Sequence, residues 1–337
     1  MAAKTTTNER DESRLMSNED THRSGARSIL LVHGRDFKPG EETYLEISLA
    51  ALRAGIERDY PDHVEAYDML AKDLAYFGDL TNEFLESIDK NYDKQLDVGD
   101  RNSALTALRA IPVRKRFGIR QYDRLPGKSA LREFIAGIAA PMLGAIGLTR
   151  WLIGCVSKDF LEYLAGDSDF ADNIRARVRD KLCEAFDRGD ELLLITHGNG
   201  CIAAYEVLWE LSHIEKYRDK YGSCKVDTWV TLGAPLGDNR IRKLLFGANE
   251  KPATRFPTNV ITWYNVAAED DYSCHDNTLA DDFKKMMDER FVSVVHDYHI
   301  YNLAVRYGKS NPHSSVGYFI HPRVSKIIVD WMEAGRA

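Results

Sequence analysis

The chain has 337 residues, of which 44% are hydrophobic and 29% are charged, a composition typical of a folded globular protein. Its formal net charge of -7 disfavours nucleic acid as a partner. The five cysteines are widely spaced and include no Cys-x-x-Cys pair, which argues against a disulfide framework and favours a reducing cytoplasm as the location.

The first part of the chain predicts a tail followed by one folded domain. Residues 1–27 are polar and charged and lack the apolar stretch of a secretory signal, so we expect a disordered tail before a domain over 28–337. The domain opens with an apolar strand over 28–33, followed by a helix over 42–58 with apolar residues on one face. A weaker strand is predicted over 63–70.

Residues 80–165 are the least regular part and predict a helical cap inserted into the domain. The cap contains an apolar run over 134–156 that is long enough to span a membrane. Pro141 and Arg150 interrupt this run, which favours a buried or lid-like helix pair. Membrane contact through 134–156 is the alternative.

After residue 167, strands and helices alternate regularly. This alternation predicts an α/β fold with a mostly parallel central sheet and helices on both faces. Ligands of such sheets bind at the carboxyl ends of the strands. The expected helices cover 169–188, 200–213 and 322–333, and the expected strands cover 191–196, 226–232, 259–266 and 292–300.

One segment has the layout of a nucleophile elbow, in which a strand turns sharply into a helix. Residues 192–204 read Leu-Leu-Leu-Ile-Thr-His-Gly-Asn-Gly-Cys-Ile-Ala-Ala, and Gly198 stands where the motif Gly-x-Ser-x-Gly places serine. Glycine suits the positive φ that this position often needs, but it cannot attack a carbonyl carbon. The Asn199 N–H is the expected oxyanion donor, and a second donor is expected from Gly34 or Arg35 after the first strand.

The remaining parts of a catalytic triad have candidates in the expected chain order. Carboxylates follow the strand over 259–266, where Asp271 is the first choice for the acid and Asp270 the second. His313 lies in a loop between the last strand and the terminal helix, so it is the candidate base. Three other histidines are expected to be structural, in a strand or at a helix entry: His296, His299 and His321.

Several groups compete to replace the missing nucleophile. Cys201 lies inside the helix after the elbow and is expected to face the packed interior. Ser314 and Ser315 adjoin His313 but do not lie on an elbow. A water molecule activated by His313 and Asp271 is a further possibility. Gly198 is either the natural residue or a replacement of serine, and the sequence leaves both open.

With these residues in place, the chain resembles the α/β-hydrolase superfamily. The resemblance lies in His33-Gly34 after the first strand, the elbow at 196–200, Gly233-Ala234-Pro235 after the next strand, Asp271 and His313. Within the superfamily, it is similar to the lipase/esterase-like branch that includes GPI-inositol-deacylase-like proteins. The resemblance covers about residues 28–335, with 80–165 poorly matched.

This resemblance implies a Ser-His-Asp type of site and hydrolysis of a small-molecule ester or a lipid-like ligand. Gly198 departs from the family pattern at the nucleophile. Two functions therefore follow, an acyl-ester hydrolase and a catalytically inactive binding or regulatory protein.

No cofactor or metal is expected from the sequence. The His-x-x-His at 296–299 lies in a predicted strand, where its spacing does not suit two helical ligands. No Gly-x-Gly-x-x-Gly follows the first strand, so a dinucleotide cofactor is not expected.

Overall fold

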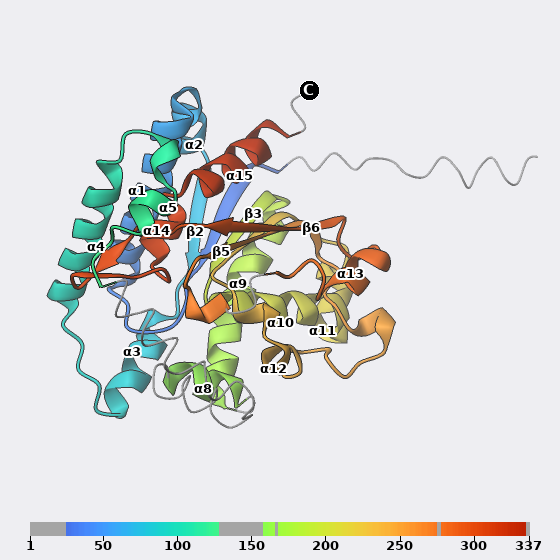
Figure 1. Ribbon diagram of the computed structural model, residues 1–337. Coiled ribbons are helices and arrows are strands. Elements are labelled where there is room, and N and C mark those ends of the chain that lie inside the picture. Colours follow the sequence, from blue (N-terminus) through green and yellow to red (C-terminus); the bar gives the residue numbers. More distant parts are fainter. Residues whose placement is uncertain (1–24, 128–157, 166–167, 275–277, 335–337) are drawn as a thin grey trace, which may run out of the picture.

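The computed structural model describes residues 25–127, 158–165, 168–274 and 278–334. Its centre is a six-stranded sheet in the order β2-β1-β3-β4-β5-β6, in which every neighbouring pair is parallel (Figure 1). The predicted α/β fold is thereby confirmed. The strands are β1 (Arg27–Val32), β2 (Ala71–Ala75), β3 (Glu191–His197), β4 (Val226–Leu232), β5 (Val260–Ala268) and β6 (Val294–Ile300), and a small antiparallel pair is formed by β7 (Val305–Arg306) and β8 (Lys309–Ser310).

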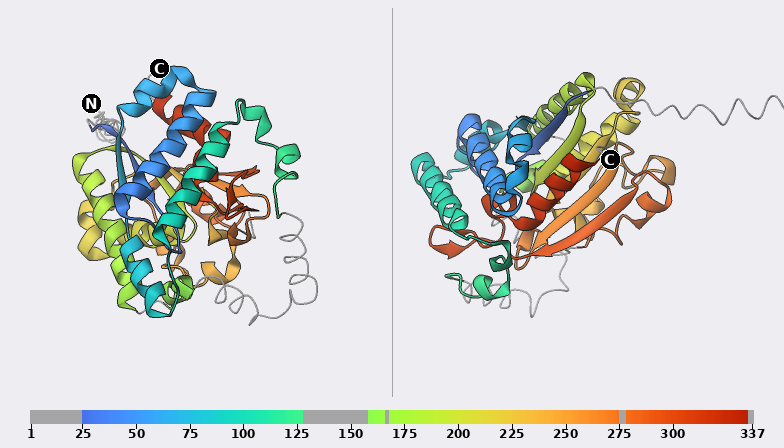
Figure 2. Two further views of the ribbon diagram at one scale, coloured as in Figure 1. Left: turned by 90° about the vertical axis from the view of Figure 1, so that its left-hand side faces the viewer. Right: turned by 90° about the horizontal axis from the view of Figure 1, so that it is seen from above.

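Helices cover both faces of this sheet (Figure 2). One face carries α1 (Glu41–Asp59), α14 (Ser315–Phe319) and α15 (Pro322–Glu333), with α4 (Lys94–Arg109) packed outside α1. The other face carries α9 (Asp169–Arg188) and α10 (Gly200–His213). The remaining described helices are α2 (Val64–Asp68), α3 (Gly78–Ser87), α5 (Ile119–Tyr122), α8 (Lys158–Leu164), α11 (Glu215–Tyr221), α12 (Asn239–Arg242) and α13 (Lys284–Asp288), and the short 3-10 turns are η2 (Pro61–His63), η3 (Arg114–Arg116), η4 (Pro235–Gly237), η5 (Pro252–Thr254) and η6 (Tyr272–Cys274).

The apolar strands are explained by burial on both faces. Along β3, Leu192 and Leu194 pack against the α9–α10 layer, whereas Leu193 and Ile195 pack against the α1–α15 layer. All four side chains are almost completely buried. A strand covered on both sides needs apolar residues at every position, so β3 reads as a continuous apolar run.

Local signals fix the helix ends, and three helices coincide with their predicted ranges. At the start of α9, the Ser168 hydroxyl accepts a hydrogen bond from the Ala171 N–H, and Gly189 ends the helix at a φ of 71°. At the start of α15, Pro322 follows His321, whose Nδ1 accepts from the Arg323 N–H at 3.1 Å. His321 is therefore the helix-entry residue that the sequence predicted.

The strand predicted over 63–70 is wrong. Residues 61–68 form the turn η2 and the short helix α2, which buries Tyr67. The strand begins later, at Ala71, with the polar sequence Ala-Lys-Asp. Because β2 is an edge strand and only its last two residues are buried, it lacks the apolar pattern that revealed the central strands.

The predicted cap over 80–165 is described in part. The helices α3 and α8 lie at the carboxyl end of the sheet, where the Asp36 N–H of the loop after β1 donates to Asp159 of α8 at 2.9 Å. The helix α4 packs beside α1 instead. The apolar run 134–156 and nearly all of the predicted tail lie outside the described residues. Within the described ranges, no helix is both long and apolar enough to cross a membrane.

The strand order places a topological switch point between β1 and β3. From β1 the chain moves to β2 on one side, and it then returns to β3 on the other. Loops leaving two such strands diverge, and the crevice between them is the usual ligand site of an open α/β sheet. His33-Gly34 follows β1, and His197 ends β3 directly before Gly198.

Candidate functional site

Gly198 lies on a sharp turn between β3 and α10. Its φ is 54°, the left-handed conformation expected for an elbow, and its N–H donates to the Leu232 carbonyl at 2.9 Å. Two residues later, a Cβ atom on Gly200 would lie 2.3 Å from the His33 carbonyl oxygen. Glycine at position 200 thus lets α10 begin directly against the end of β1.

His313 and Asp271, predicted as base and acid, are in contact. The His313 Nδ1 atom lies 3.1 Å and 3.0 Å from the two carboxylate oxygens of Asp271. The opposite ring nitrogen, Nε2, is buried and has no hydrogen-bond partner among the described residues. A Cβ atom on Gly198 would lie 3.0 Å from this Nε2. The free nitrogen of the histidine therefore faces position 198, where the sequence analysis expects a nucleophile.

Asp271 is held in its charged form by its surroundings. It is buried, and it accepts hydrogen bonds from the Tyr318 hydroxyl at 2.7 Å and from the Ser273 N–H at 2.9 Å. Burial alone raises the pKa of this carboxyl. The His313 imidazole and these hydrogen bonds outweigh burial, so the pKa of Asp271 lies below its ordinary value.

Asp270, the second choice for the acid, lies elsewhere. It has a φ of 59°, and its carboxylate lies 3.0 Å from the Tyr122 hydroxyl of α5. The backbone thus directs the two neighbouring carboxylates to different partners. The structure brings Asp271, and not Asp270, to His313.

Three further residues support the pair, of which the sequence had singled out only Gly233. The Asn302 amide nitrogen donates to the carbonyls of Pro312 and Ser314, each at 2.9 Å, and so holds the loop on both sides of His313. Tyr318 bridges Asp271 to the Ala268 N–H, which donates to its hydroxyl at 2.9 Å. A Cβ atom on Gly233 (φ 56°) would lie 2.7 Å from Asp271 Oδ2. The Gly-Ala-Pro sequence after a strand was the sequence signal for this close approach of the Gly233 backbone to the Asp271 carboxylate.

The residues predicted to donate to an oxyanion lie beside the elbow. The Cα atom of Gly34 would be 3.7 Å from a Cβ on Gly198, and Asn199 precedes the first residue of α10. The Arg35 side chain is buried and contacts the Tyr272 hydroxyl, with Ser273 Oγ at 3.3 Å. Arg35 thus ties the loop after β1 to the loop that carries Asp271.

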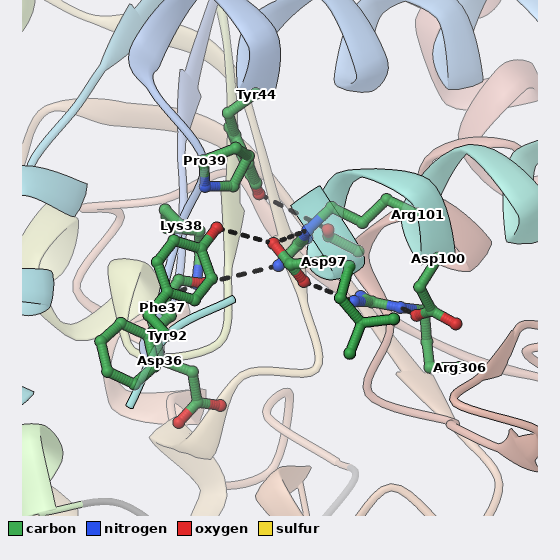
Figure 3. Close-up of polar contacts among 12 residues, drawn as sticks. Asp36, Phe37, Lys38, Pro39, Tyr44, Tyr92, Asp97, Asp100, Arg101 and Arg306 are labelled. Atoms are coloured by element: carbon green, nitrogen blue, oxygen red, sulfur yellow. Dashed lines mark hydrogen bonds and ion pairs between the residues drawn. The ribbon is translucent and has the colours of Figure 1, made fainter. Parts of the chain in front are cut away.

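Lys38 organises the loop after β1 from within (Figure 3). Its buried ammonium group donates to the backbone carbonyls of Arg35, Asp36 and Phe37. Burial and then the nearby Arg101 guanidinium lower the pKa of Lys38 to about 7. Beyond it lies a cluster in which Asp97 pairs with Arg101 at 2.8 Å and with Arg306 at 2.7 Å.

Two further buried histidines lie at the carboxyl ends of β1 and β3. The His33 Nε2 accepts from the Phe77 N–H at 3.0 Å, so its Nδ1 carries the proton and donates to the Gly34 carbonyl at 2.8 Å. His197 lies 3.0 Å from the His313 carbonyl, and its ring centroid is 4.6 Å from that of His313. Burial is the main cause that holds the pKa of both His33 and His197 well below the ordinary value.

The substitute nucleophiles are poorly placed. Cys201 is fully buried in α10, its sulfur accepts from Thr196 at 3.1 Å, and burial raises its pKa to about 12. Ser315 contacts the Tyr44 hydroxyl at 3.5 Å. The Ser314 hydroxyl is buried without a hydrogen-bond partner among the described residues. None of the three lies on the turn at 198.

A small cavity of about 20 Å³ adjoins the elbow. Its described lining combines apolar and aromatic side chains with a polar side formed by Arg35, Thr81, Asp159 and Asn199. Elsewhere, His296 and His299 lie exposed on the edge strand β6. In the described ranges, no group of three or more His, Cys, Asp or Glu side chains is arranged to hold a metal ion.

Comparisons of this chain with protein-family models, with curated proteins and with solved structures gave no match.

Proposed function

We propose that the chain carries an acyl-ester hydrolase site of the α/β-hydrolase type, in which glycine occupies the nucleophile position. The observation that carries the proposal is the relation between Gly198 and His313. A side chain at position 198 would point at the free Nε2 of a histidine whose other nitrogen is held by a buried carboxylate. This is the relation that general-base activation of a nucleophile requires.

In the proposed reaction, His313 takes a proton from a water molecule, and that water attacks the ester carbonyl carbon. Asp271 orients the ring and stabilises the imidazolium that forms. The N–H groups of Asn199 and of Gly34 or Arg35 stabilise the oxyanion. His313 then returns the proton to the leaving alcohol, so the products are a carboxylic acid and an alcohol.

The substrate proposed is a small-molecule ester or a lipid-like ester, as in the lipase/esterase-like branch. Without a serine no acyl-enzyme forms, and serine hydrolases that lose their nucleophile are slowed by roughly a million-fold. We therefore expect slow hydrolysis by this chain and a large gain when serine is supplied.

The test is the variant Gly198→Ser. The left-handed backbone at 198 costs a non-glycine residue on the order of 1–3 kcal/mol, and the His313 ring must shift slightly to admit the new Cβ. Gly198→Ala is the matched control, because it adds the same Cβ without a hydroxyl. We expect G198S to react with a fluorophosphonate probe and to hydrolyse p-nitrophenyl esters with a burst, and G198A to do neither.

Adding His313→Ala to G198S should abolish both reactions. A folded G198S chain that neither reacts with the probe nor turns over activated esters would contradict the proposal.

The second candidate function is ligand binding without catalysis. It is favoured by Gly198 itself, because a chain with glycine at this position has no nucleophile on the elbow. Turnover of esters by the natural chain, lost in His313→Ala, would exclude a purely binding role. Saturable binding of an ester that is never hydrolysed would support it.

A further inference from the structure

The segment that follows α4 and includes η3 and α5 lies on the outside of the described part of the molecule (Figure 2). It is rich in basic residues. We call residues 113–124 the basic strip. It holds one acidic residue, Asp123, in a chain whose net charge is -7. Its five basic residues are all exposed: Arg114, Lys115, Arg116, Arg120 and Arg124.

These five cations are not used inside the fold. Their side chains have no hydrogen bond or ion pair with any residue that the structure describes. By contrast, Arg175 and Arg179 pair with glutamates of α10 at 3.0 Å and 2.5 Å. The charge of the basic strip is therefore directed at solvent or at a partner.

Aliphatic side chains alternate with these cations at the surface, whereas the aromatic ones are buried. Val113 is 50% exposed and Ile119 is 52% exposed. Phe117 packs beneath the Arg58 guanidinium at 4.3 Å, and Tyr122 donates to the Glu269 carbonyl at 2.9 Å. The two rings thus anchor the basic strip from below, while cations and aliphatic groups face outward.

We propose that the basic strip docks the protein on an anionic phospholipid surface. Cations near such a surface are attracted to its negative potential, and exposed aliphatic side chains gain by entering the boundary between headgroups and acyl chains. A nucleic-acid surface would instead combine cations with exposed aromatic rings for stacking, and both rings here are buried. The observations therefore favour lipid over nucleic acid.

The end of α5 contacts the loop that carries Asp271. The Tyr122 hydroxyl at its end is 3.0 Å from the carboxylate of Asp270, the neighbour of Asp271 in sequence. The docking proposal stands independently of the proposed ester hydrolysis.

The experiment is flotation of the full-length chain with vesicles. We expect binding to phosphatidylcholine vesicles that contain phosphatidylserine, weaker binding at higher salt, and no binding to phosphatidylcholine alone. The triple variant Arg114→Gln, Lys115→Gln, Arg116→Gln should bind the anionic vesicles roughly 100-fold more weakly, given the contribution of each cation near such a surface.

The matched control removes the same charge from exposed lysines near α12 and α13, on the opposite side of the view in Figure 1 from α5: Lys243→Gln, Lys284→Gln, Lys285→Gln. This control should bind like the natural chain. Val113→Ser combined with Ile119→Ser should weaken the binding that persists at high salt.

Three outcomes overturn the proposal. Equal binding by the two triple variants would assign attachment to another segment or to net charge alone. Absence of binding to both kinds of vesicle would exclude lipid docking. Binding to a single-stranded RNA, lost in the basic-strip variant without any vesicle binding, would assign the surface to nucleic acid.

Discussion

The Tyr318 hydroxyl donates a 2.7 Å hydrogen bond to Asp271, the carboxylate that holds His313. Both residues are buried, so this bond helps to keep a charged group inside the protein. A hydrogen bond to a buried charge contributes more to stability than one between neutral groups. The pair that faces Gly198 is thus a structural element as well as a candidate catalytic one.

Tyr318→Phe should therefore lower the free energy of unfolding by about 2 kcal/mol at neutral pH. Because the folded-state pKa of Asp271 lies below its ordinary value, its charge stabilises the fold above that ordinary value. This contribution is lost as the pH falls through the folded-state pKa. Urea unfolding should show the difference between the two chains shrinking in acid to the part caused by the lost Ala268 N–H bond.

Tyr221→Phe is the control for this change. It removes the same atom from a surface hydrogen bond to Asp187, and it should leave the unfolding free energy nearly unchanged. If Tyr318→Phe lowered the free energy of unfolding by the same amount at neutral and strongly acidic pH, the role of Asp271 would be contradicted.

His321 should make the fold sensitive to mild acid. Burial lowers its pKa to about 3, whereas an unfolded chain binds the proton near 6.5. The unfolded state thus holds more protons between these values, and stability falls as the pH drops below 6.5. At about pH 5 this one residue lowers the free energy of unfolding by about 2 kcal/mol.

His321→Asn should remove the part of the pH dependence of the unfolding free energy that His321 causes. Asparagine still caps α15, but it does not titrate in this range. Urea unfolding at about pH 7.5 and about pH 5 measures it. His296→Asn, on exposed β6, should keep the slope of the natural chain. An unchanged slope in His321→Asn would contradict the prediction.

Gly233→Ala should lower the free energy of unfolding more than Gly308→Ala. Both glycines have positive φ, at 56° and 74°, so alanine costs each about 1–2 kcal/mol from the backbone alone. At Gly308 nothing lies within 4 Å of the new Cβ, whereas at Gly233 it would meet Asp271 at 2.7 Å. We expect about 3 kcal/mol or more for Gly233→Ala in chemical unfolding. Equal costs would show that the carboxylate moves freely.

Lys38→Met should loosen the loop after β1. The substitution leaves the carbonyls of Arg35, Asp36 and Phe37 without the ammonium group to which they bind, at a cost of at least about 2 kcal/mol. Hydrogen exchange followed by mass spectrometry should show faster exchange over 34–39.

Lys72→Met is the matched control for Lys38. Lys72 also donates to three carbonyls of its own neighbourhood, those of Tyr67, Asp68 and Leu70, but far from the elbow. It should affect exchange over 67–72 and not over 34–39. Unchanged exchange over 34–39 in Lys38→Met would show that the loop holds its shape without the lysine.

The sequence predicts most of the fold because the central strands, which are buried on both faces, are continuous runs of apolar residues. The run Leu192–Ile195 and the Ser168 and Gly189 helix ends are local signals. At the edge of the sheet the same rule fails, since β2 is largely polar and its neighbour α2 carries the apolar residues that suggested a strand.

The candidate site could be predicted only where its residues follow strand ends. Gly198 and Asp271 each follow an apolar strand, and His313 follows the last strand of the sheet, so the topology of a parallel sheet brings them together. The sequence around Tyr318 and Asn302 contains no comparable signal, because their contacts depend on how two distant loops pack. The divergent paths of Asp270 and Asp271 depend on one backbone angle, which adjacent identical residues do not reveal.

The contacts that assemble the crevice join very distant parts of the chain. His313 meets Asp271 across 42 residues and His197 across 116, and Arg35 meets Tyr272 across 237. Closing such long loops costs chain entropy, so these contacts form only when most of the sheet is in place. No short fragment of the protein contains the His313–Asp271–Gly198 arrangement. An NMR signal from the proton on His313 Nδ1 would therefore report that folding of the whole domain is complete.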